Sequence, residues 1–427
     1  MKKVIVIGGG LSGLASAVLL AKNNYKVTLL EASPKLGGRT YSRYDPQKNF
    51  TYDNGQHLLL SCYDHTLDYL NLIGTSHKTS IIKTIFITFL NRTGESFYLS
   101  GESYKYPFDL LNAILKFKVL SLSERLSVSG LLIRLKFTNP DNLSNLTVKA
   151  WLTQLRQSEN SIKYLWNILV VATLNASPEH AAASSFAKVL KEIFINRTDG
   201  YHFIVPNAGL SELFVDDALE YIQNHEGNIK TSERVEKLFY SDKNILKVNT
   251  NKGSYENFDY IISAVPIHAL YKVLPEFSGK NKVNPEYKPI LSIHIKLNTE
   301  RFNQQYYAFL DSPVQWVFVH ENKISIVISD AENLIDYSKD VLEKLIFDEM
   351  EIHFSFFSRS DVEETVIIKE KRATFVPSPE FEMARSGIKS AFDNLILAGD
   401  WTNTGLPSTI ESAVKSGFDA AKQILRQ

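Results

Sequence analysis

The sequence predicts an α/β fold, in which a domain built on a parallel sheet is interleaved with a second, α+β domain. The first observation is an apolar run at residues 4–7, which continues into a glycine-rich turn and a helical pattern. A buried parallel strand has such a continuous run. The second is a similar strand near the C-terminus, at residues 394–399. The third is the length, because 427 residues exceed what one core organises and predict two or three domains.

The turn after the first strand has the glycine spacing of a dinucleotide-binding site. Gly8 allows the tight turn, Gly10 lets a pyrophosphate approach the backbone, and Gly13 lets the helix pack on the strand. The N–H groups at the start of that helix, at Leu11 and Ser12, then face the phosphates.

An acidic residue follows the second predicted strand, residues 26–30. Glu31 lies 18 residues after Gly13, close to the spacing of roughly 20 at which a carboxylate binds ribose hydroxyls. Strand, glycines, helix, strand and acid in this order predict a Rossmann-like nucleotide site. The alternative interpretation is a glycine turn in an ordinary α/β unit.

The composition excludes several classes of protein. Lys plus Arg and Asp plus Glu both number 47, so the formal net charge is zero and no nucleic-acid partner is expected. The single cysteine, Cys62, cannot form an internal disulfide and suits a reducing cytosol. A core or half-buried thiol is expected, because no base accompanies it as a nucleophile would require. No metal site is expected either, since Cys and His residues lack metal-ligand spacing.

The sequence predicts neither a leader nor a membrane-spanning helix. The run at 4–7 is too short for a signal core, and no stretch of about 18 uncharged apolar residues occurs. A cytoplasmic protein is expected, with peripheral contact at the inner face of the cell membrane left open. The candidate for such contact is the apolar, helical segment 108–137, because it has basic flanks. A buried helical hairpin is the alternative.

Two polar turns follow Glu31. The first contains Gly37, Gly38 and Arg39, where the glycines let the backbone pass close to a ligand and the arginine neutralises phosphate. The second is the polar cluster at residues 53–57, directly before a strand-like segment. Its alternative interpretation is an Asx-type turn.

Taken together, these motifs resemble the FAD-dependent amine oxidase and phytoene desaturase superfamily. The similarity rests on the glycine turn, Glu31, the Gly-Gly-Arg turn and the sequence Leu-Ile-Leu-Ala-Gly-Asp at 395–400. Further segments are similar to its squalene-associated branch, the hydroxysqualene dehydroxylases: 53–57, 172–175, 371–375, and 398–402 with 405–407. The resemblance spans nearly the whole chain, but residues 76–145 and 276–365 carry few matching motifs.

The resemblance implies FAD as the cofactor. It implies that Asp400 binds ribityl or phosphate-linked hydroxyls and that the backbone of Val235 binds the adenine. The helix from about Thr409 would offer N–H groups and a positive dipole to the flavin edge that becomes negative on reduction; an ordinary capped helix is the alternative. The full set of implied contacts is Gly8, Gly10, Leu11, Ser12, Gly13, Glu31, Ala32, Gly37, Gly38, Arg39, Asn54, Gly55, Gln56, His57, Val235, Gly399, Asp400, Ser408, Thr409 and Ile410.

The resemblance also implies a reaction, the reductive dehydroxylation of hydroxysqualene to squalene in squalene and hopanoid biosynthesis. An acid would protonate the allylic hydroxyl, and hydride from reduced FAD would capture the cation in a long apolar pocket. His57 is the first candidate acid, because histidine titrates near neutrality; a structural contact is its alternative role. Glu411 is the second candidate, and it could instead stabilise the helix dipole. The sequence does not identify the electron donor.

Two other classes of function stay open. A carotenoid-type desaturase or an amine oxidase would use the same flavin oxidatively, although no cage for a deprotonated amine is recognisable. A non-catalytic isoprenoid-binding protein, similar to the Rab escort and GDP-dissociation inhibitor proteins, would tolerate loss of the flavin contacts, which this chain retains. A flavin absorption band in the purified protein would exclude that class.

The predicted elements divide into two interleaved domains. Residues 1–78, 203–275 and 388–427 are predicted to form the FAD-binding domain, a parallel sheet with a β-meander. Residues 79–202 and 276–387 are predicted to form the substrate-binding domain, a helical hairpin with a sheet. The chain would cross between them several times.

Overall fold

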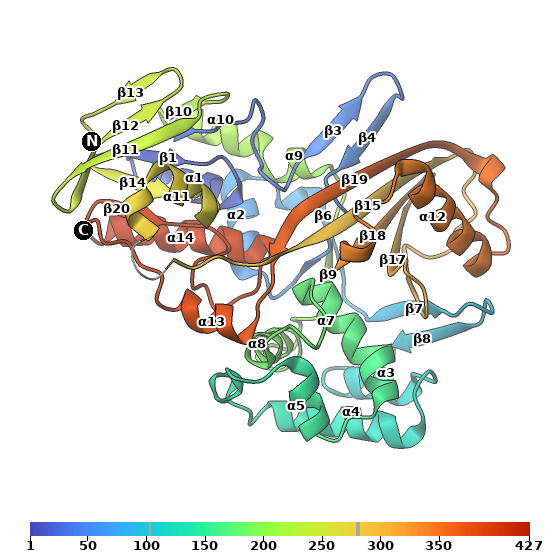
Figure 1. Ribbon diagram of the computed structural model, residues 1–427. Helices are drawn as coiled ribbons and strands as arrows, with labels where there is room; N and C mark the ends of the chain where they lie inside the picture. Colours follow the sequence, from blue (N-terminus) through green and yellow to red (C-terminus); the bar gives the residue numbers. More distant parts are fainter. Residues whose placement is uncertain (102–103, 279–281) are drawn as a thin grey trace.

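A five-stranded parallel sheet forms the centre of the first domain. The computed structural model describes residues 1–101, 104–278 and 282–427 (Figure 1). The sheet has the order β10-β2-β1-β14-β20, and its pairings are parallel. Its strands are β1 (Lys3–Ile7), β2 (Lys26–Leu30), β10 (Asn228–Lys230), β14 (Tyr260–Ser263) and β20 (Leu395–Leu397). The strands predicted at 4–7, 26–30 and 394–399 are confirmed, and they bring the two ends of the chain into one sheet.

Both faces of this sheet are covered, because β1 is apolar on both sides. Val4 and Val6 pack among helices, whereas Ile5 and Ile7 pack under a β-meander. The helices are α1 (Leu11–Lys22), α2 (Asp64–Ile73), α9 (Leu210–Phe214), α10 (Asp216–Asn224) and α14 (Ile410–Leu425). The other face carries β11 (Val235–Ser241), β12 (Asn244–Thr250), β13 (Gly253–Tyr255) and α11 (Ile267–Val273).

A seven-stranded sheet of order β19-β15-β18-β17-β16-β7-β8 forms the second domain. Only β16 and β7 pair in parallel among these described strands. The strands are β7 (Phe86–Leu90), β8 (Ser96–Ser100), β15 (Tyr287–Leu297), β16 (Tyr306–Phe309), β17 (Trp316–His320), β18 (Lys323–Ser329) and β19 (Val362–Phe375).

The two faces of the larger sheet meet different partners. On β16, Tyr306 and Ala308 face a block of helices, whereas Tyr307 and Phe309 face α12 (Lys339–His353). The block consists of α3 (Phe108–Lys116), α4 (Leu122–Leu135), α5 (Val148–Gln154), α6 (Glu159–Ser161), α7 (Asn167–Leu174) and α8 (Ala183–Phe194). The segment predicted as a helical hairpin thus forms α3 and α4, at the lower edge of Figure 1.

Short elements connect the two domains. They are the hairpin β3 (Ser42–Asp45) and β4 (Phe50–Asp53), the small sheet β5 (Leu59–Leu60), β9 (Phe203–Pro206) and β6 (Thr79–Ile82), and α13 (Pro379–Arg385). Each large sheet lies wholly within the segments predicted for its domain. The boundaries themselves stay predictions, since β6 pairs with β9 across the proposed division.

The described part of the chain contains no helix that is both long and apolar enough to cross a membrane. Cys62 is a half-buried free thiol, as expected. Burial, with a smaller contribution from Glu192, raises its pKa to about 12. A thiol of this kind stays protonated at neutral pH and is a poor nucleophile.

Candidate functional site

The glycine turn 8–13 lies at the carboxyl edge of the parallel sheet, between β1 and its two neighbours. Gly8 has a φ of +105°, and a Cβ there would lie 2.9 Å from the Ala264 carbonyl oxygen. A Cβ on Gly13 would lie 1.9 Å from the Gly8 carbonyl oxygen. Glycine is therefore required at both positions, for backbone conformation and for close packing of α1 on the strand.

The second glycine turn packs directly on the first. The N–H group of Gly37 donates to the Gly9 carbonyl at 2.8 Å, and a Cβ on Gly38 would lie 3.1 Å from the Gly10 Cα. No side chain among the described residues caps α1 at Gly10. The first N–H groups of α1, which include those of Leu11 and Ser12, are thus available to an external anion.

Glu31 stands beside this pair of turns, at the end of β2. Its carboxylate accepts the N–H of Gly9 and the N–H of Ser33, both at 2.7 Å. Ala32 lies between these contacts in sequence. Next to it, the Glu233 N–H donates to the Glu31 carbonyl at 2.8 Å, and buried Val235 follows at the start of β11. The predicted ribose and adenine contacts are therefore neighbours in space.

Arg39 and Asp400 join the N-terminal and C-terminal parts of the site. The guanidinium contacts the Asp400 carboxylate at 2.7 Å and donates to the Ala373 carbonyl at 2.6 Å. The Ser408 hydroxyl also donates to Asp400. Burial alone would raise the pKa of Asp400, but the Arg39 charge and these hydrogen bonds hold the pKa below its usual range. Asp400 is thus ionised at neutral pH.

A fully buried arginine that the sequence analysis missed holds the loop after Asp400. Arg385, on α13, donates to the carbonyl of Asp400 at 2.6 Å and to that of Thr402 at 2.8 Å. Its charge is balanced by Glu382 at 3.0 Å. Arg385 lies in a polar stretch of sequence that resembles any exposed helix, so no local signal indicates its burial.

The start of α14 is tied to the start of α1. Thr409 caps α14 through its side chain, which accepts the Ser412 N–H at 3.1 Å. The Gly399 N–H donates to Ser416 at 2.8 Å, and the Ser416 hydroxyl lies 3.2 Å from that of Ser12. The helix that begins at Ile410 therefore shares the site with the glycine turn, as the predicted contacts of one cofactor require.

The polar cluster 53–57 lies between the two domains. The Asn54 amide donates to the Arg39 carbonyl at 2.8 Å, which links the cluster to the Gly-Gly-Arg turn. A Cβ on Gly55 would lie 3.2 Å from the hydroxyl oxygen of buried Ser292 on β15. Gln56 and His57 follow directly, and both are half-buried. The cluster thus connects the cofactor side to the longest central strand of the second domain.

His57 is uncharged at neutral pH in this arrangement. Burial, together with the nearby positive charge of Arg39, lowers its pKa to about 4. His294, on β15, has the same property because burial lowers its pKa to about 4. The His294 ring donates to or accepts from Ser325 at 2.9 Å and lies 5.9 Å from the Tyr52 ring.

Glu411 is buried and saturated with hydrogen bonds at the N-terminus of α2. Its carboxylate accepts the backbone N–H groups of His65 at 3.0 Å and Thr66 at 2.8 Å. It also contacts the Thr66 hydroxyl at 2.7 Å and the His65 ring at 2.8 Å. This carboxylate caps α2, because it accepts hydrogen bonds from N–H groups that have no partner within the helix.

Two of the segments singled out by resemblance contact each other. Asn175, in a left-handed conformation at the end of α7, donates to the Thr374 hydroxyl at 2.8 Å. Its side-chain amide oxygen, Oδ1, accepts the Asp330 N–H at 2.6 Å. Because the neighbouring Ala373 carbonyl binds Arg39, segment 172–175 braces segment 371–375, which in turn positions the cofactor side.

The chain belongs to the flavin containing amine oxidoreductase family, whose sequence profile matches residues 11–425. It is an FAD-dependent oxidoreductase with an α/β FAD-binding fold. It is 28% identical to the hydroxysqualene dehydroxylase of Zymomonas mobilis over 424 residues, 97% of each chain. It is 22% identical to the 15-cis-phytoene desaturase of Glycine max, over 99% of this chain and 79% of that protein.

A solved structure shows the same fold. The cyclohexylamine oxidase of Brevibacterium oxydans superposes with a TM-score of 0.75 at 15% identity, over 100% of this chain and 99% of that one. The residues described above fit FAD, because uncapped N–H groups, an acid at the end of β2 and an ionised Asp400 surround one edge of the sheet. The FAD prediction is confirmed by the family, whereas the individual contacts stay predictions.

Proposed function

We propose that the protein reduces hydroxysqualene to squalene. The observation that carries this proposal is the similarity to a hydroxysqualene dehydroxylase over nearly the full length of both chains. The resemblance of cluster 53–57 to the same branch also supports the proposal, and this cluster links the Arg39 turn to β15 of the second domain. The phytoene desaturase relative is less similar and is covered less completely.

The chain's own residues bind and orient the cofactor in this proposal. The first N–H groups of α1 would bind the pyrophosphate, and Glu31 would accept ribose hydroxyls. Ionised Asp400, held by Arg39, would accept ribityl hydroxyls. When bound and reduced, FAD supplies the hydride that replaces the hydroxyl, which leaves as water with one proton.

We assign the role of proton donor to the leaving hydroxyl to His57 rather than to Glu411. The Glu411 oxygens are occupied by four donors around the start of α2. His57 lies in the cluster between the domains, where a substrate on the β15 side could meet the cofactor. With a pKa of about 4, the imidazolium is scarce at neutral pH, so the rate should rise as the pH falls.

Anaerobic turnover tests the reaction. The FAD-loaded protein is reduced stoichiometrically and mixed with hydroxysqualene in detergent, and squalene is measured by gas chromatography with mass spectrometry. We expect about one squalene per reduced flavin and none with oxidised flavin. Absence of squalene would overturn the proposal, and dehydrogenation of phytoene by the oxidised protein would favour the desaturase.

The substrate and the product are both nearly insoluble in water. We therefore infer that the protein works peripherally at the inner face of the cell membrane and receives electrons from a separate donor. The basic, apolar segment 108–137 supports this location. Fractionation of cells that express the tagged full chain tests it, because a protein recovered only in the soluble fraction would contradict the inference.

A further inference from the structure

Helix α4 has apolar residues on two opposite sides. Val128, Leu131 and Leu135 are buried against the helical block. The outer side exposes a stripe whose members are Leu122, Leu126, Ile133 and Phe137, with exposed fractions of 61%, 58%, 61% and 81%. Their spacing of four, seven and four residues places them on one face of the helix and its C-terminal extension. A soluble surface helix would be polar on that face.

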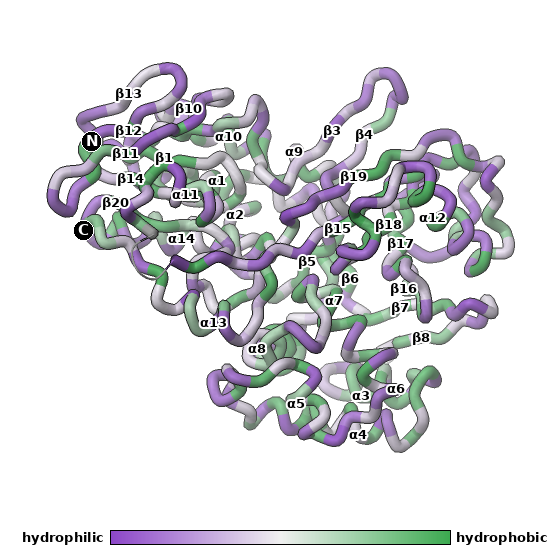
Figure 2. Tube along the Cα trace, in the orientation of Figure 1, coloured by the Kyte–Doolittle hydropathy of each residue, from purple (hydrophilic) through white to green (hydrophobic). Residues whose placement is uncertain are grey.

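The adjoining helix α3 extends the apolar surface. It exposes Phe108 at 64% and Leu115 at 40%, which are seven residues apart and share a face. Both helices lie at the edge of the molecule farthest from the parallel sheet in Figure 1. Figure 2 shows hydrophobic and hydrophilic residues alternating along this outer helix pair. Contiguous exposed apolar residues of this kind indicate an interaction surface.

The segment that contains α3 and α4 is positively charged, which is opposite to the charge of anionic lipids. Between residues 104 and 137 there are two acidic residues, Asp109 and Glu124. Six basic residues share the segment: Lys105, Lys116, Lys118, Arg125, Arg134 and Lys136. Its net charge is therefore +4, whereas the whole chain is neutral. Asp109 is buried, and Glu124 is engaged by Ser121 and Ser158.

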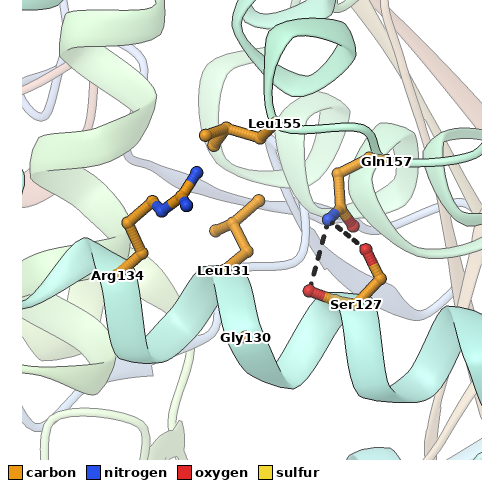
Figure 3. Close-up of a pocket in the computed structure, with 6 residues that line it drawn as sticks. All are labelled: Ser127, Gly130, Leu131, Arg134, Leu155 and Gln157. Carbon is orange, nitrogen blue, oxygen red and sulfur yellow. Dashed lines mark hydrogen bonds between the residues drawn. The ribbon is translucent and has the colours of Figure 1, made fainter.

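A small pocket of about 200 Å³ adjoins the stripe. It is lined by Ser127, Gly130, Leu131, Arg134, Leu155 and Gln157 (Figure 3). Figure 3 shows the Arg134 side chain reaching across the pocket towards Leu155. Arg134 is exposed and forms no ion pair with any residue that the structure describes. An anionic phosphate at the rim of this pocket would supply the missing partner.

We propose that α4, with α3, docks on the surface of a bilayer that contains anionic phospholipids. The stripe of α4 inserts at the boundary of the acyl chains, while Arg134 and Lys136 bind headgroup phosphates. A second copy of the chain is the less suitable occupant, because a two-fold contact would bring two segments of charge +4 together. The proposal does not rest on the proposed reaction, since docking is measured without turnover.

Sedimentation with lipid vesicles tests the docking. The FAD-loaded full chain is mixed with vesicles of phosphatidylcholine, or of phosphatidylcholine with 30% phosphatidylglycerol. We expect binding to the anionic vesicles that weakens with salt. The double variant Leu126→Glu/Ile133→Glu should lower the partition coefficient at least about tenfold. Val341→Glu is the matched control, because Val341 is 49% exposed on helix α12 and should bind as the unmodified protein does.

A second double variant tests the basic residues Arg134 and Lys136. Arg134→Gln/Lys136→Gln should lower binding to anionic vesicles by roughly fivefold per charge removed and leave the salt dependence flatter. Equal circular dichroism, melting temperature and flavin content show that each variant is folded. Failure of the unmodified protein to bind, or unchanged binding by Leu126→Glu/Ile133→Glu, would overturn the proposal. A dimer in light scattering that this double variant converts to a monomer would also overturn it.

Discussion

Asp400 and Glu411 are two buried carboxylates near the start of α14, and they are held in opposite ways. The Asp400 carboxylate contacts the Arg39 guanidinium and the Ser408 hydroxyl, both through Oδ2. Glu411 is enclosed by four donors from His65 and Thr66. A buried carboxylate can therefore bind a ligand only if it keeps acceptor capacity for the ligand's hydroxyls. A carboxylate whose acceptor sites are all filled by protein donors stabilises the fold instead.

Replacing His57 should have the largest effect on the reaction. We expect His57→Ala to lower kcat by about 100-fold or more with little loss of FAD, because general acid catalysis contributes about 10² to 10⁴. In the unmodified protein kcat/KM should rise as the pH falls from 7 towards 5, since the pKa is about 4, and in the variant this dependence should vanish. An unchanged kcat would remove His57 as the acid and reopen the role of Glu411.

Breaking the Arg39–Asp400 pair should weaken the binding of FAD. Asp400→Asn removes the negative charge that contacts the Arg39 guanidinium and that would accept ribityl hydroxyls, and we expect FAD affinity to fall about 100-fold. Equilibrium dialysis or flavin fluorescence measures this. Asp393→Asn, at an exposed position before β20, is the control and should retain FAD. Full FAD occupancy in Asp400→Asn would show that the ion pair does not hold the cofactor.

Glu411→Gln tests whether the Glu411 carboxylate is structural or catalytic. The glutamine side chain has an NH₂ group in place of one carboxylate oxygen, and this donor would face the N–H groups of α2. We therefore expect the free energy of unfolding to fall by about 3 kcal/mol. The kcat of the folded, FAD-loaded variant should stay within about twofold. Denaturant titration and turnover on the same sample measure both quantities. A large loss of kcat without loss of stability would contradict the capping role.

The smallest effect concerns His294, a buried titratable group on β15. Burial lowers its pKa to about 4 from the ordinary 6.5, so below pH 6.5 the unfolded chain binds a proton that the folded chain does not. Stability is then complete at neutral pH and is lost as the pH falls. Between pH 7 and pH 5 the expected loss is about 2 kcal/mol. His294→Asn should lack this component in denaturant titrations, whereas the exposed His77→Asn should keep it.

The local parts of the site were predictable from short stretches of sequence. Gly8 and Gly13 have the backbone and packing requirements that their spacing indicates, and β1, α1 and β2 follow in the predicted order. Arg385 and Ser416 were not predictable, because a buried arginine and a helix serine have no distinctive local pattern. Their roles depend on loops and helices that meet only in the folded chain.

The sequence by itself determined the parallel strand, the glycine turn and the helix behind it, because conformational limits and apolar periodicity act between near neighbours. It also placed apolar and basic residues together in segment 108–137. Only the tertiary structure decided which of them remain outside, as the exposed stripe of α4 shows. It likewise decided that Asp400 is paired with a cation and that the Glu411 oxygens are filled by four donors. These hydrogen bonds join residues hundreds of positions apart, so they exist only once the N-terminal and C-terminal segments have packed into one domain.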